Sequence, residues 1–456
     1  MPDTIAAIAT ANAPGGIGIV RVSGPEAFGI ARRVFRPKNR LDWEGVRGYR
    51  MAYGIIGIER DSGLEEIDEA VCLFFRGPGS YTGEDVAEFQ CHGGPLLLQE
   101  VLQAALDAGA RMAGPGEFTR RAWLHGRIGL SQAEAVMRLI NAQSEQALRA
   151  AHGALGGALA ARIAGVREGL IALAAHIGAW TDYPEEDIDP LRDGEAETVL
   201  KEAEGALAGL IERSKGAQAV LEGVSAALVG RPNVGKSSLL NRMAGYERAI
   251  VTALPGTTRD TVTETVRLGN LTLRLTDTAG LRETEHPVEK AGVERSVAAM
   301  RGADLVLAVL DASEGVTAED EALLAQCDPD RTIVVWNKVD LVDSPRRYAQ
   351  GNWRAVHTSA VTGDGLDDLA RAAEGICQTA GFVPGEAMLA TQRQAQCAVE
   401  AQAALREALC ALAQGFAPDA VSVCLEDAVQ ALFSLTGERA GDAVVEEVFR
   451  AFCVGK

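Results

Sequence analysis

The chain has 456 residues and a formal net charge of −19 at pH 7, from 44 Lys and Arg against 63 Asp and Glu. A hydrophobic content of 47% is typical of a globular protein and excludes a largely disordered one. Lys and Arg drive nucleic-acid binding, so this charge excludes a protein that holds RNA with most of its surface. A local basic groove or a basic partner protein remains open. The length predicts roughly three domains.

The sequence predicts neither a membrane span nor a secretory signal. No apolar run is long enough to cross a bilayer, and Met1-Pro-Asp-Thr4 lacks a basic start followed by an apolar stretch. We therefore expect a cytoplasmic protein without membrane contact. The eight cysteines contain no CxxC pair, so in a reducing compartment most of them should be small buried hydrophobes.

Residues 1–119 are expected to form an α+β domain. The runs Ile17–Val22 and Ala70–Phe75 are rich in branched and aromatic residues and are bounded by Gly and Pro, which predicts strands. A helix is predicted over Pro95–Ala110, directly after the glycines at 93 and 94.

Residues 120–218 and 380–456 are predicted to be helical, the first because long Ala- and Leu-rich repeats contain few β-branched residues. The acidic break at 182–189 is expected to be a solvated loop rather than a metal site. In the last segment apolar residues recur at helical spacing, and Gly437 stands where a C-terminal cap belongs. We expect the two segments to form one discontinuous helical domain with another domain inserted in it. The apolar positions are Val421, Leu425, Ala428, Leu432 and Leu435.

The inserted segment, 219–379, alternates strands and helices in the order of a nucleotide-binding domain. The runs Thr261–Val266 and Leu271–Leu275 flank Gly269-Asn270, which suits an antiparallel hairpin. That hairpin would place one antiparallel edge on an otherwise parallel sheet. The fold class predicted for the whole chain is multidomain α/β.

A phosphate loop follows the apolar run Ala226–Val229, as the motif Gly230-Arg-Pro-Asn-Val-Gly-Lys-Ser237. Its glycines let backbone N–H groups point at phosphates, Lys236 reaches the β and γ phosphates, and Ser237 offers a hydroxyl to Mg²⁺. The alternative, a chance Gly-rich turn before a helix, is disfavoured by two further motifs.

These two motifs indicate guanine. Asp277-Thr-Ala-Gly280 suits a water-mediated Mg²⁺ contact and a backbone donor to the γ-phosphate. In Asn337-Lys-Val-Asp340 the last carboxylate can accept both N1–H and N2–H of guanine, whereas adenine would leave it unpaired. The predicted GTP-binding residues are Asn233, Val234, Gly235, Lys236, Ser237, Ser238, Thr252, Thr257, Thr258, Asp277, Thr278, Ala279, Gly280, Asn337, Lys338, Asp340, Ser359 and Ala360.

The hydrolytic step differs from that of Ras-type GTPases, which orient water with a Gln after Asp-x-x-Gly. That position holds Leu281, which cannot form a hydrogen bond. Arg259 and Arg282 are near in sequence, but neither is an obvious arginine finger. Another group must orient the water and another positive charge must offset the phosphates, or hydrolysis is slow.

Motifs along nearly the whole chain resemble those of the bacterial and organellar tRNA wobble-uridine modification GTPases, the MnmE (TrmE) family. The terminal Cys-x-Gly-Lys on a chain with this N-terminal block is the most specific of them. The motifs are Ile17-Gly-Ile-Val-Arg-Val-Ser-Gly24, Tyr81-Thr-Gly-Glu-Asp85, Cys91-His-Gly-Gly-Pro95, Pro115-Gly-Glu-Phe118, Ser131-Gln-Ala-Glu-Ala135, Gly256-Thr-Thr-Arg-Asp260 and Phe452-Cys-Val-Gly-Lys456.

The resemblance implies a potassium-activated GTPase of Ras-like fold. It implies that Ser237 and Thr258 bind Mg²⁺ and that Glu289 orients the attacking water, whereas the residues alone favour a surface glutamate paired with a neighbouring Arg or Lys. The implied K⁺ would supply the charge of an arginine finger. Its ligands would be Asn233, Thr252, Leu254 and Thr257.

The resemblance also implies that the N-terminal domain dimerises and binds 5-formyltetrahydrofolate or a related tetrahydrofolate. Arg and Lys suit the folate carboxylates and Glu suits its amino-pyrimidine edge, although each could be a solvated surface charge. Cys453 is implied to be catalytic, with a positioning role as the alternative, since nothing in the sequence lowers its pKa. The matching folate positions are Arg21, Glu88, Arg127, which stands where many members have Lys, and Lys456.

The function implied is GTP hydrolysis coupled to the addition of an aminomethyl or carboxymethylaminomethyl group to C5 of the wobble uridine of certain tRNAs. A homodimer, a flavin-dependent partner protein and tRNA are the implied partners. The alternative is a GTP-dependent ribosome-assembly switch of the Era/Der type. The acidic helical flanks disfavour it, because such switches usually carry a basic RNA-binding domain.

Overall fold

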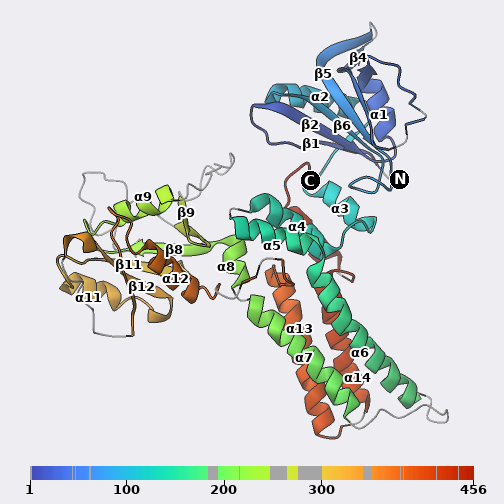
Figure 1. Ribbon diagram of the computed structural model, residues 1–456. Helices are drawn as coiled ribbons and strands as arrows, with labels where there is room; N and C mark the ends of the chain where they lie inside the picture. Colours follow the sequence, from blue (N-terminus) through green and yellow to red (C-terminus); the bar gives the residue numbers. More distant parts are fainter. Residues whose placement is uncertain are drawn as a thin grey trace. The chain divides into compact units, whose positions relative to one another are not determined.

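The computed structural model forms two compact units, residues 1–137 with 436–456, and residues 138–435 (Figure 1). The structure describes residues 3–43, 45–46, 48–60, 63–142, 144–182, 194–214, 216–246, 264–275, 300–342, 352–379, 382–383, 385–416, 418–439 and 441–456.

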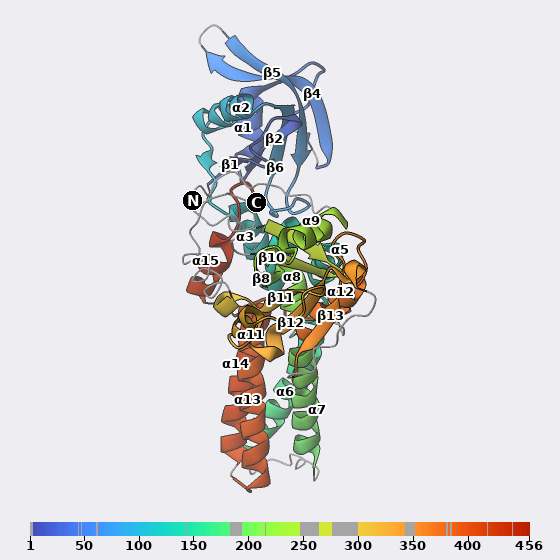
Figure 2. The ribbon, with the colours of Figure 1, turned by 90° about the vertical axis from the view of Figure 1, so that its left-hand side faces the viewer.

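The first unit is built on a seven-stranded sheet of order β3-β4-β5-β6-β2-β1-β7. Helices α1 (Ala27–Val34) and α2 (Pro95–Asp107) lie side by side against one face of it (Figure 2). The two predicted strands and the predicted helix of this segment are confirmed. The strands are β1 (Ile5–Ile8), β2 (Gly15–Ser23), β3 (Phe35–Pro37), β4 (Arg50–Arg60), β5 (Gly63–Phe75), β6 (Val86–Gly93) and β7 (Arg111–Met112).

Alternation along the strands decides which side chains face these helices. In β2, Val20 and Val22 are fully buried, whereas Arg21 between them points to the opposite face. The partner strand β6 follows the same rule, because Phe89 is buried and Glu88 lies across from Arg21. Charged side chains therefore collect on the face that α1 and α2 leave uncovered.

Three helices and the chain end complete the first unit. Helices α3 (Glu117–Leu124), α4 (Leu130–Asn141) and α15 (Asp442–Arg450) follow the sheet, and most of α4 belongs to this unit. Phe449 and Phe452 pack against Leu130 of α4. The compact unit thus includes 120–137 and 436–456, and the domain boundaries expected from the sequence stay a prediction.

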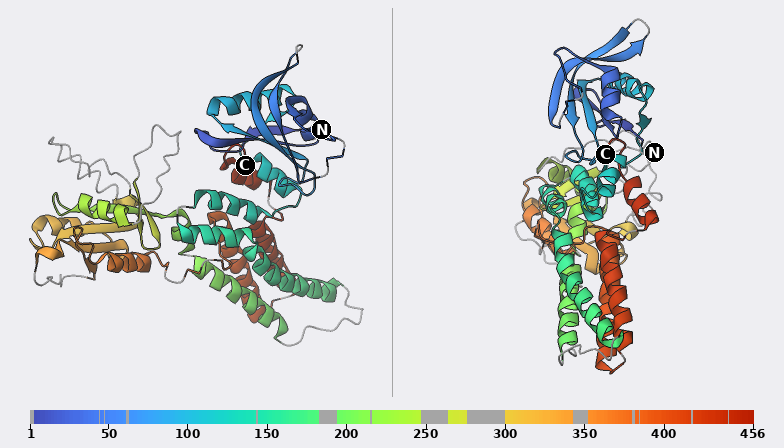
Figure 3. Two further views of the ribbon diagram at one scale, coloured as in Figure 1. Left: turned by 45° about the horizontal axis from the view of Figure 1, so that its top comes forward. Right: turned by 90° about the vertical axis from the view of Figure 1, so that its right-hand side faces the viewer.

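Four long helices of the second unit share one apolar core (Figure 3). They are α6 (Ala158–Asp182), α7 (Glu195–Ser214), α13 (Gln392–Ala413) and α14 (Pro418–Thr436). The five apolar residues that the sequence predicted at helical spacing lie in α14 and are all buried in this core. Gly437 follows α14 with a φ of +82°. Two shorter helices, α5 (Glu145–Leu155) and α8 (Ala217–Glu222), pack against each other beside it.

The rest of the second unit is a six-stranded sheet of order β13-β12-β11-β8-β10-β9, parallel except for β9 at one edge. The hairpin expected around Gly269-Asn270 is confirmed as β9 and β10. Helices α9 (Lys236–Tyr246) and α12 (Leu366–Ile376) cover one face and α11 (Ala318–Leu324) the other. The strands are β8 (Val224–Val229), β9 (Glu264–Leu268), β10 (Leu271–Leu275), β11 (Leu305–Asp311), β12 (Thr332–Asn337) and β13 (Arg354–His357).

The fold class is therefore multidomain α/β, as predicted. Central strands such as β11 are buried along their whole length, as expected of a parallel sheet covered on both faces. Within the described part of the chain, no helix combines the length and the apolar character that crossing a bilayer requires.

Candidate functional site

The loop between β8 and α9 is shaped by two glycines. Gly230 has a φ of +148° and Gly235 a φ of +94°, which L side chains rarely adopt. A Cβ at Gly230 would collide with the carbonyl of Val309, and one at Gly235 with the side-chain amide of Asn337. Asn233 between them also has a positive φ, +65°. The loop therefore lies close against the ends of two neighbouring strands, as a phosphate cradle requires.

Lys236 lies across this loop. Its Nζ donates to the carbonyl oxygens of Gly230 at 2.8 Å and Arg231 at 2.7 Å. Burial lowers the pKa of this ammonium group. The ammonium group of Lys236 thus contacts two carbonyl oxygens, which carry only partial negative charge. Its positive charge is not neutralised by these contacts, so the loop fits an anionic ligand. Ser237 and Ser238 are exposed in the first turn of α9, where backbone N–H groups also favour anions.

Asn337, at the end of β12, joins this loop to a second one. Its side chain is buried, its Nδ2 donates to the carbonyl of Val234 at 2.9 Å, and its Oδ1 accepts from the backbone N–H of Ala360 at 3.0 Å. Ser359 is buried and Asp340 is exposed. The structure thus brings the phosphate loop and the Asn-Lys-x-Asp motif together at the carboxyl edge of the parallel sheet, where ligands of such sheets bind.

Lys338 has an ion pair that the motifs do not reveal. Its Nζ lies 2.6 Å from Oδ2 of Asp311, the buried last residue of β11. Burial alone would raise the pKa of that carboxyl, but hydrogen bonds from Lys338 and Ser313 outweigh it and leave the pKa below its ordinary value. The sequence did contain a signal for this ion pair, because Asp311 is the acidic last residue of an otherwise apolar strand.

Arg242, in α9, also escaped the sequence analysis. Its Nε donates to the carbonyl of Ala360 at 3.1 Å, and its terminal nitrogen donates to the carbonyl of Val361. One side chain thereby links the helix after the phosphate loop to the loop after β13. Arg242 belongs to none of the motifs, so the sequence contained no indication that it would contact this loop.

Part of the predicted nucleotide site lies outside the described residues. This applies to the segments 247–263 and 276–299. The residues concerned are Thr252, Leu254, Thr257, Thr258, Asp277, Thr278, Ala279, Gly280, Leu281 and Glu289.

A second set of predicted residues meets in the first unit. Nε of Arg21 lies 2.7 Å from Oε1 of Glu88, and both side chains are largely buried. The guanidinium of Arg21 also stacks near the rings of Tyr81 and Phe118, at 5.8 and 5.5 Å from their centroids. Burial and the Arg21 cation lower the pKa of the Lys456 ammonium, against the opposing charge of Glu88. Arg21 and Lys456 thus bring two positive charges near the single carboxylate of Glu88. This excess of positive charge fits an anionic ligand.

The end of the chain is tied to this set. The carbonyls of Cys453 and Lys456 accept from the backbone N–H of Gly116 and Phe118, at 3.3 and 3.2 Å. Gly455 has a φ of +99°, and a Cβ there would collide with the carbonyl of Ile8. The Cys453 side chain is exposed.

Arg127 is the remaining predicted folate position. Its side chain is exposed, and its backbone N–H donates to the carbonyl of Ala122 at 2.8 Å. The part of the structure that is described records no contact between Arg127 and the Arg21–Glu88 pair.

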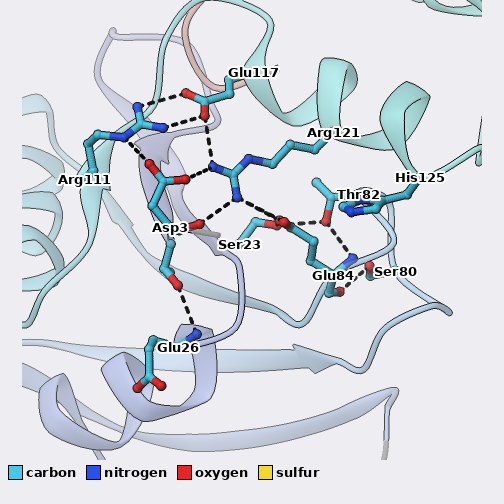
Figure 4. Close-up of polar contacts among 11 residues, drawn as sticks. Asp3, Ser23, Glu26, Ser80, Thr82, Glu84, Arg111, Glu117, Arg121 and His125 are labelled. Atoms are coloured by element: carbon cyan, nitrogen blue, oxygen red, sulfur yellow. Dashed lines mark hydrogen bonds and ion pairs between the residues drawn. The ribbon is translucent and has the colours of Figure 1, made fainter. Parts of the chain in front are cut away.

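Arg121 is the centre of a cluster of ion pairs in the same unit (Figure 4). Its guanidinium donates to Asp3 at 2.7 Å, Glu117 at 3.0 Å and Glu84 at 3.1 Å. Ser23, the last residue of β2, donates to Glu84 at 2.7 Å. The cluster therefore joins the start of the chain, the 80–85 loop and α3, which carries Phe118.

Family models match both parts of the chain. The model described as the GTP-binding protein TrmE N-terminus matches residues 4–127, and the model described as the MnmE helical domain matches residues 130–453. A curated protein of Chloroflexus aurantiacus, named tRNA modification GTPase MnmE, is 45% identical, with 100% of each chain covered. A protein of the same name from Symbiobacterium thermophilum is 44% identical over 100% of this chain and 99% of its own.

Among solved structures, the G domain of the T. maritima FeoB iron transporter matches 34% of this chain and 99% of its own, at 28% identity and a TM-score of 0.26. Aquifex aeolicus Era bound to GDP and AlF4⁻ matches 40% of this chain and 66% of its own, at 25% identity and the same TM-score. The agreement of two family models and of relatives alike from end to end decides the assignment: the chain belongs to the MnmE family of tRNA modification GTPases.

Proposed function

We propose that this chain hydrolyses GTP to drive the modification of C5 of the wobble uridine of certain tRNAs. GTP hydrolysis is the activity by which its family is named. The observation that carries the nucleotide assignment is the bridge made by Asn337 between the carbonyl of Val234 and the N–H of Ala360. Because it joins the two loops, this bridge supports the assignment of the phosphate loop and the base-selecting motif to one nucleotide.

In this proposal Lys236 exchanges its two carbonyl partners for the β and γ phosphates, and Ser237 contributes a hydroxyl to Mg²⁺. The exposed carboxylate of Asp340 accepts two hydrogen bonds from guanine, and the backbone of the loop from Thr358 to Ala360 faces guanine O6. Bound Mg²⁺ neutralises charge on the phosphates. Lys338 stays on Asp311 and fixes the strand end from which Asp340 projects.

Potassium is proposed as the second cation. Asn233 has the side-chain oxygen that K⁺ requires, and its positive φ turns the loop at that point. Thr252, Leu254 and Thr257 would complete the set, Thr258 would join Ser237 on Mg²⁺, and Glu289 would orient the water. These loop positions rest on the family resemblance.

The first unit is proposed to bind 5-formyltetrahydrofolate or a related tetrahydrofolate. Arg21 and Lys456 fit the carboxylates of such a ligand, and Glu88 fits an amino-pyrimidine edge. Arg127 would add a cation from the segment after α3. Cys453 is proposed to act beside this site, since its backbone is held by Gly116 while its thiol is exposed.

The chain is proposed to work in the cytoplasm as a homodimer with a flavin-dependent partner protein, adding an aminomethyl or carboxymethylaminomethyl group to tRNA. Its domains are proposed to be 1–119, the helical pair 120–218 and 380–456, and the inserted 219–379. An Era/Der-type assembly switch is not favoured, because relatives named MnmE match the whole length of the chain.

The test is GTP hydrolysis by the full chain in KCl and in NaCl. We expect potassium to stimulate hydrolysis, Asn233→Ala to abolish the stimulation, and Glu289→Ala to abolish turnover while nucleotide binding remains. Equal rates in the two salts would remove the potassium step. Wobble-uridine modification in a deletion strain carrying these variants then separates a modification enzyme from an assembly factor.

A further inference from the structure

One segment of the first unit is basic, although the chain as a whole is acidic. Residues 31–50 contain seven Lys or Arg and two acidic residues, although the whole chain carries −19. Six of these basic residues are described, and all six are exposed. We call them the basic edge: Arg32 and Arg33 in the last turn of α1, Arg36 in β3, Lys38 and Arg40 after it, and Arg50 at the start of β4.

The fold gathers these residues along one rim of the sheet. Among the described strands β3 pairs with β4 alone, at the end of the strand order. The N–H of Lys38 donates to the carbonyl of Tyr53 at 3.0 Å, which continues the pairing past the end of β3. Since the two segments run antiparallel, Arg40 is carried toward Arg50. Val34 and Phe35 are buried and fix the junction of α1 with β3.

Most of the basic edge keeps its charge unneutralised. Lys38 pairs with Glu69. For the five arginines, the residues that the structure describes provide no ion pair. Asp42, the acidic residue closest in sequence, accepts from the N–H of Gly45 at 3.1 Å. Arg111 and Arg121 of the same unit are instead surrounded by carboxylates.

Structural roles explain only part of this pattern. Arg32 and Arg33 complement the dipole at the end of α1, an effect worth about 0.3–1 kcal/mol. A charge on an edge strand, such as Arg36, discourages pairing with another chain. Neither role requires five arginines in one rim. A lipid surface would also require an apolar face, but Ile30 and Val34 of α1 are buried in the core.

We propose that the basic edge binds the phosphate backbone of tRNA. Arginine pairs with phosphate through its planar fork of N–H groups, and such contacts position an RNA without reading its sequence. The acidic remainder of the surface repels RNA, so contact concentrates at this rim. The identity of the RNA rests on the proposed function; the location on this chain is the new element.

The test compares two double variants of the full chain, titrated with an unmodified tRNA transcript between about 50 and 200 mM KCl. Arg33→Ala with Arg36→Ala removes two charges from the basic edge. Arg162→Ala with Arg213→Ala removes two exposed charges from α6 and α7 as the matched control. The slope of log K against log salt is negative, and each lost phosphate contact reduces its magnitude by about 0.7–0.9. We expect a decrease of about 1.4–1.8 for the first variant and none for the control.

Equal slopes for the two variants, or no tRNA binding by the unaltered chain, would overturn the inference. So would unchanged tRNA binding with lost binding to phosphatidylserine vesicles, which would assign the rim to a membrane. Arg33→Lys with Arg36→Lys should restore most of the affinity, and thermal unfolding shows that each variant is folded. Potassium-stimulated GTP hydrolysis should be unchanged in all variants. If the unaltered chain hydrolysed no GTP but bound tRNA with the expected salt dependence, the proposed function would be contradicted and the phosphate-backbone contact at the basic edge would stand.

Discussion

Single side chains join the two halves of the nucleotide site, and Arg242 does so without belonging to a motif. It donates to the carbonyls of Ala360 and Val361 and so fixes the loop whose N–H groups are proposed to face guanine. Because it touches no nucleotide atom in this arrangement, it is a positioning residue. Its effect should appear in nucleotide affinity rather than in the hydrolytic step.

Arg242→Ala should weaken GDP and GTP binding about fivefold, because net hydrogen-bond contributions are about 1 kcal/mol. KM for GTP should rise by the same factor while kcat changes little. Calorimetric titration with GDP and steady-state hydrolysis measure the two effects. Arg371→Ala is the control, since that exposed side chain pairs with Asp368 of the same helix. An unchanged dissociation constant for Arg242→Ala would contradict the positioning role.

The elements of the first unit are held together by ion pairs as well as by apolar packing. Arg121 is buried and ties α3 to Glu84 and to Asp3 near the start of β1 (Figure 4). Removing one partner of a buried ion pair leaves uncompensated charge and costs about 3–5 kcal/mol. Arg121→Ala should therefore lower the unfolding midpoint of this unit by roughly 6–20 °C.

Arg111→Ala provides the matched comparison, because that side chain is half exposed and exposed ion pairs contribute about 0–1 kcal/mol. Calorimetry on the full chain should show the transition of the first unit moving far more in Arg121→Ala than in Arg111→Ala. Similar shifts in the two variants would mean that burial does not set the strength of this cluster.

The same cluster predicts a dependence on pH. Hydrogen bonding to Arg111, aided by Arg121, lowers the pKa of Asp3 from 3.8 to about 2. A carboxyl with a depressed pKa contributes stability above its unfolded pKa, and that contribution disappears as the pH falls from about 4 toward 2. Asp3→Asn should thus lower the unfolding midpoint at pH 6 by a few degrees, with a difference that narrows on acidification. A difference independent of pH would assign the effect to packing.

Across the whole molecule, local patterns were predictable and distant partnerships were not. Helical spacing identified the buried face of α14, and the turn Gly269-Asn270 identified the β9–β10 hairpin, because both depend on neighbouring residues. The Arg121–Asp3 ion pair joins residues 118 positions apart, and the chain end bonds to Gly116 and Phe118. Such contacts follow from tertiary packing, which leaves no periodic signal in the sequence.

The end of the chain is attached to the first unit, so the proposed folate site and the proposed nucleotide site belong to different compact units. Lys456 lies with Arg21 and Glu88, whereas the phosphate loop belongs to the other compact unit. Gly455→Ala places a Cβ against the carbonyl of Ile8 at a φ of +99°, so the last residues must shift.

We expect this variant to bind 5-formyltetrahydrofolate at least tenfold more weakly and to lose tRNA modification, while its intrinsic GTP hydrolysis remains. Val454→Ala, at a half-exposed side chain, is the control. Equilibrium binding of the folate and GTP hydrolysis on the same preparation measure both properties. If Gly455→Ala reduced hydrolysis as strongly as folate binding, the position of the chain end would be coupled to the nucleotide site, and the two chemistries would not be separable by a change at the chain end.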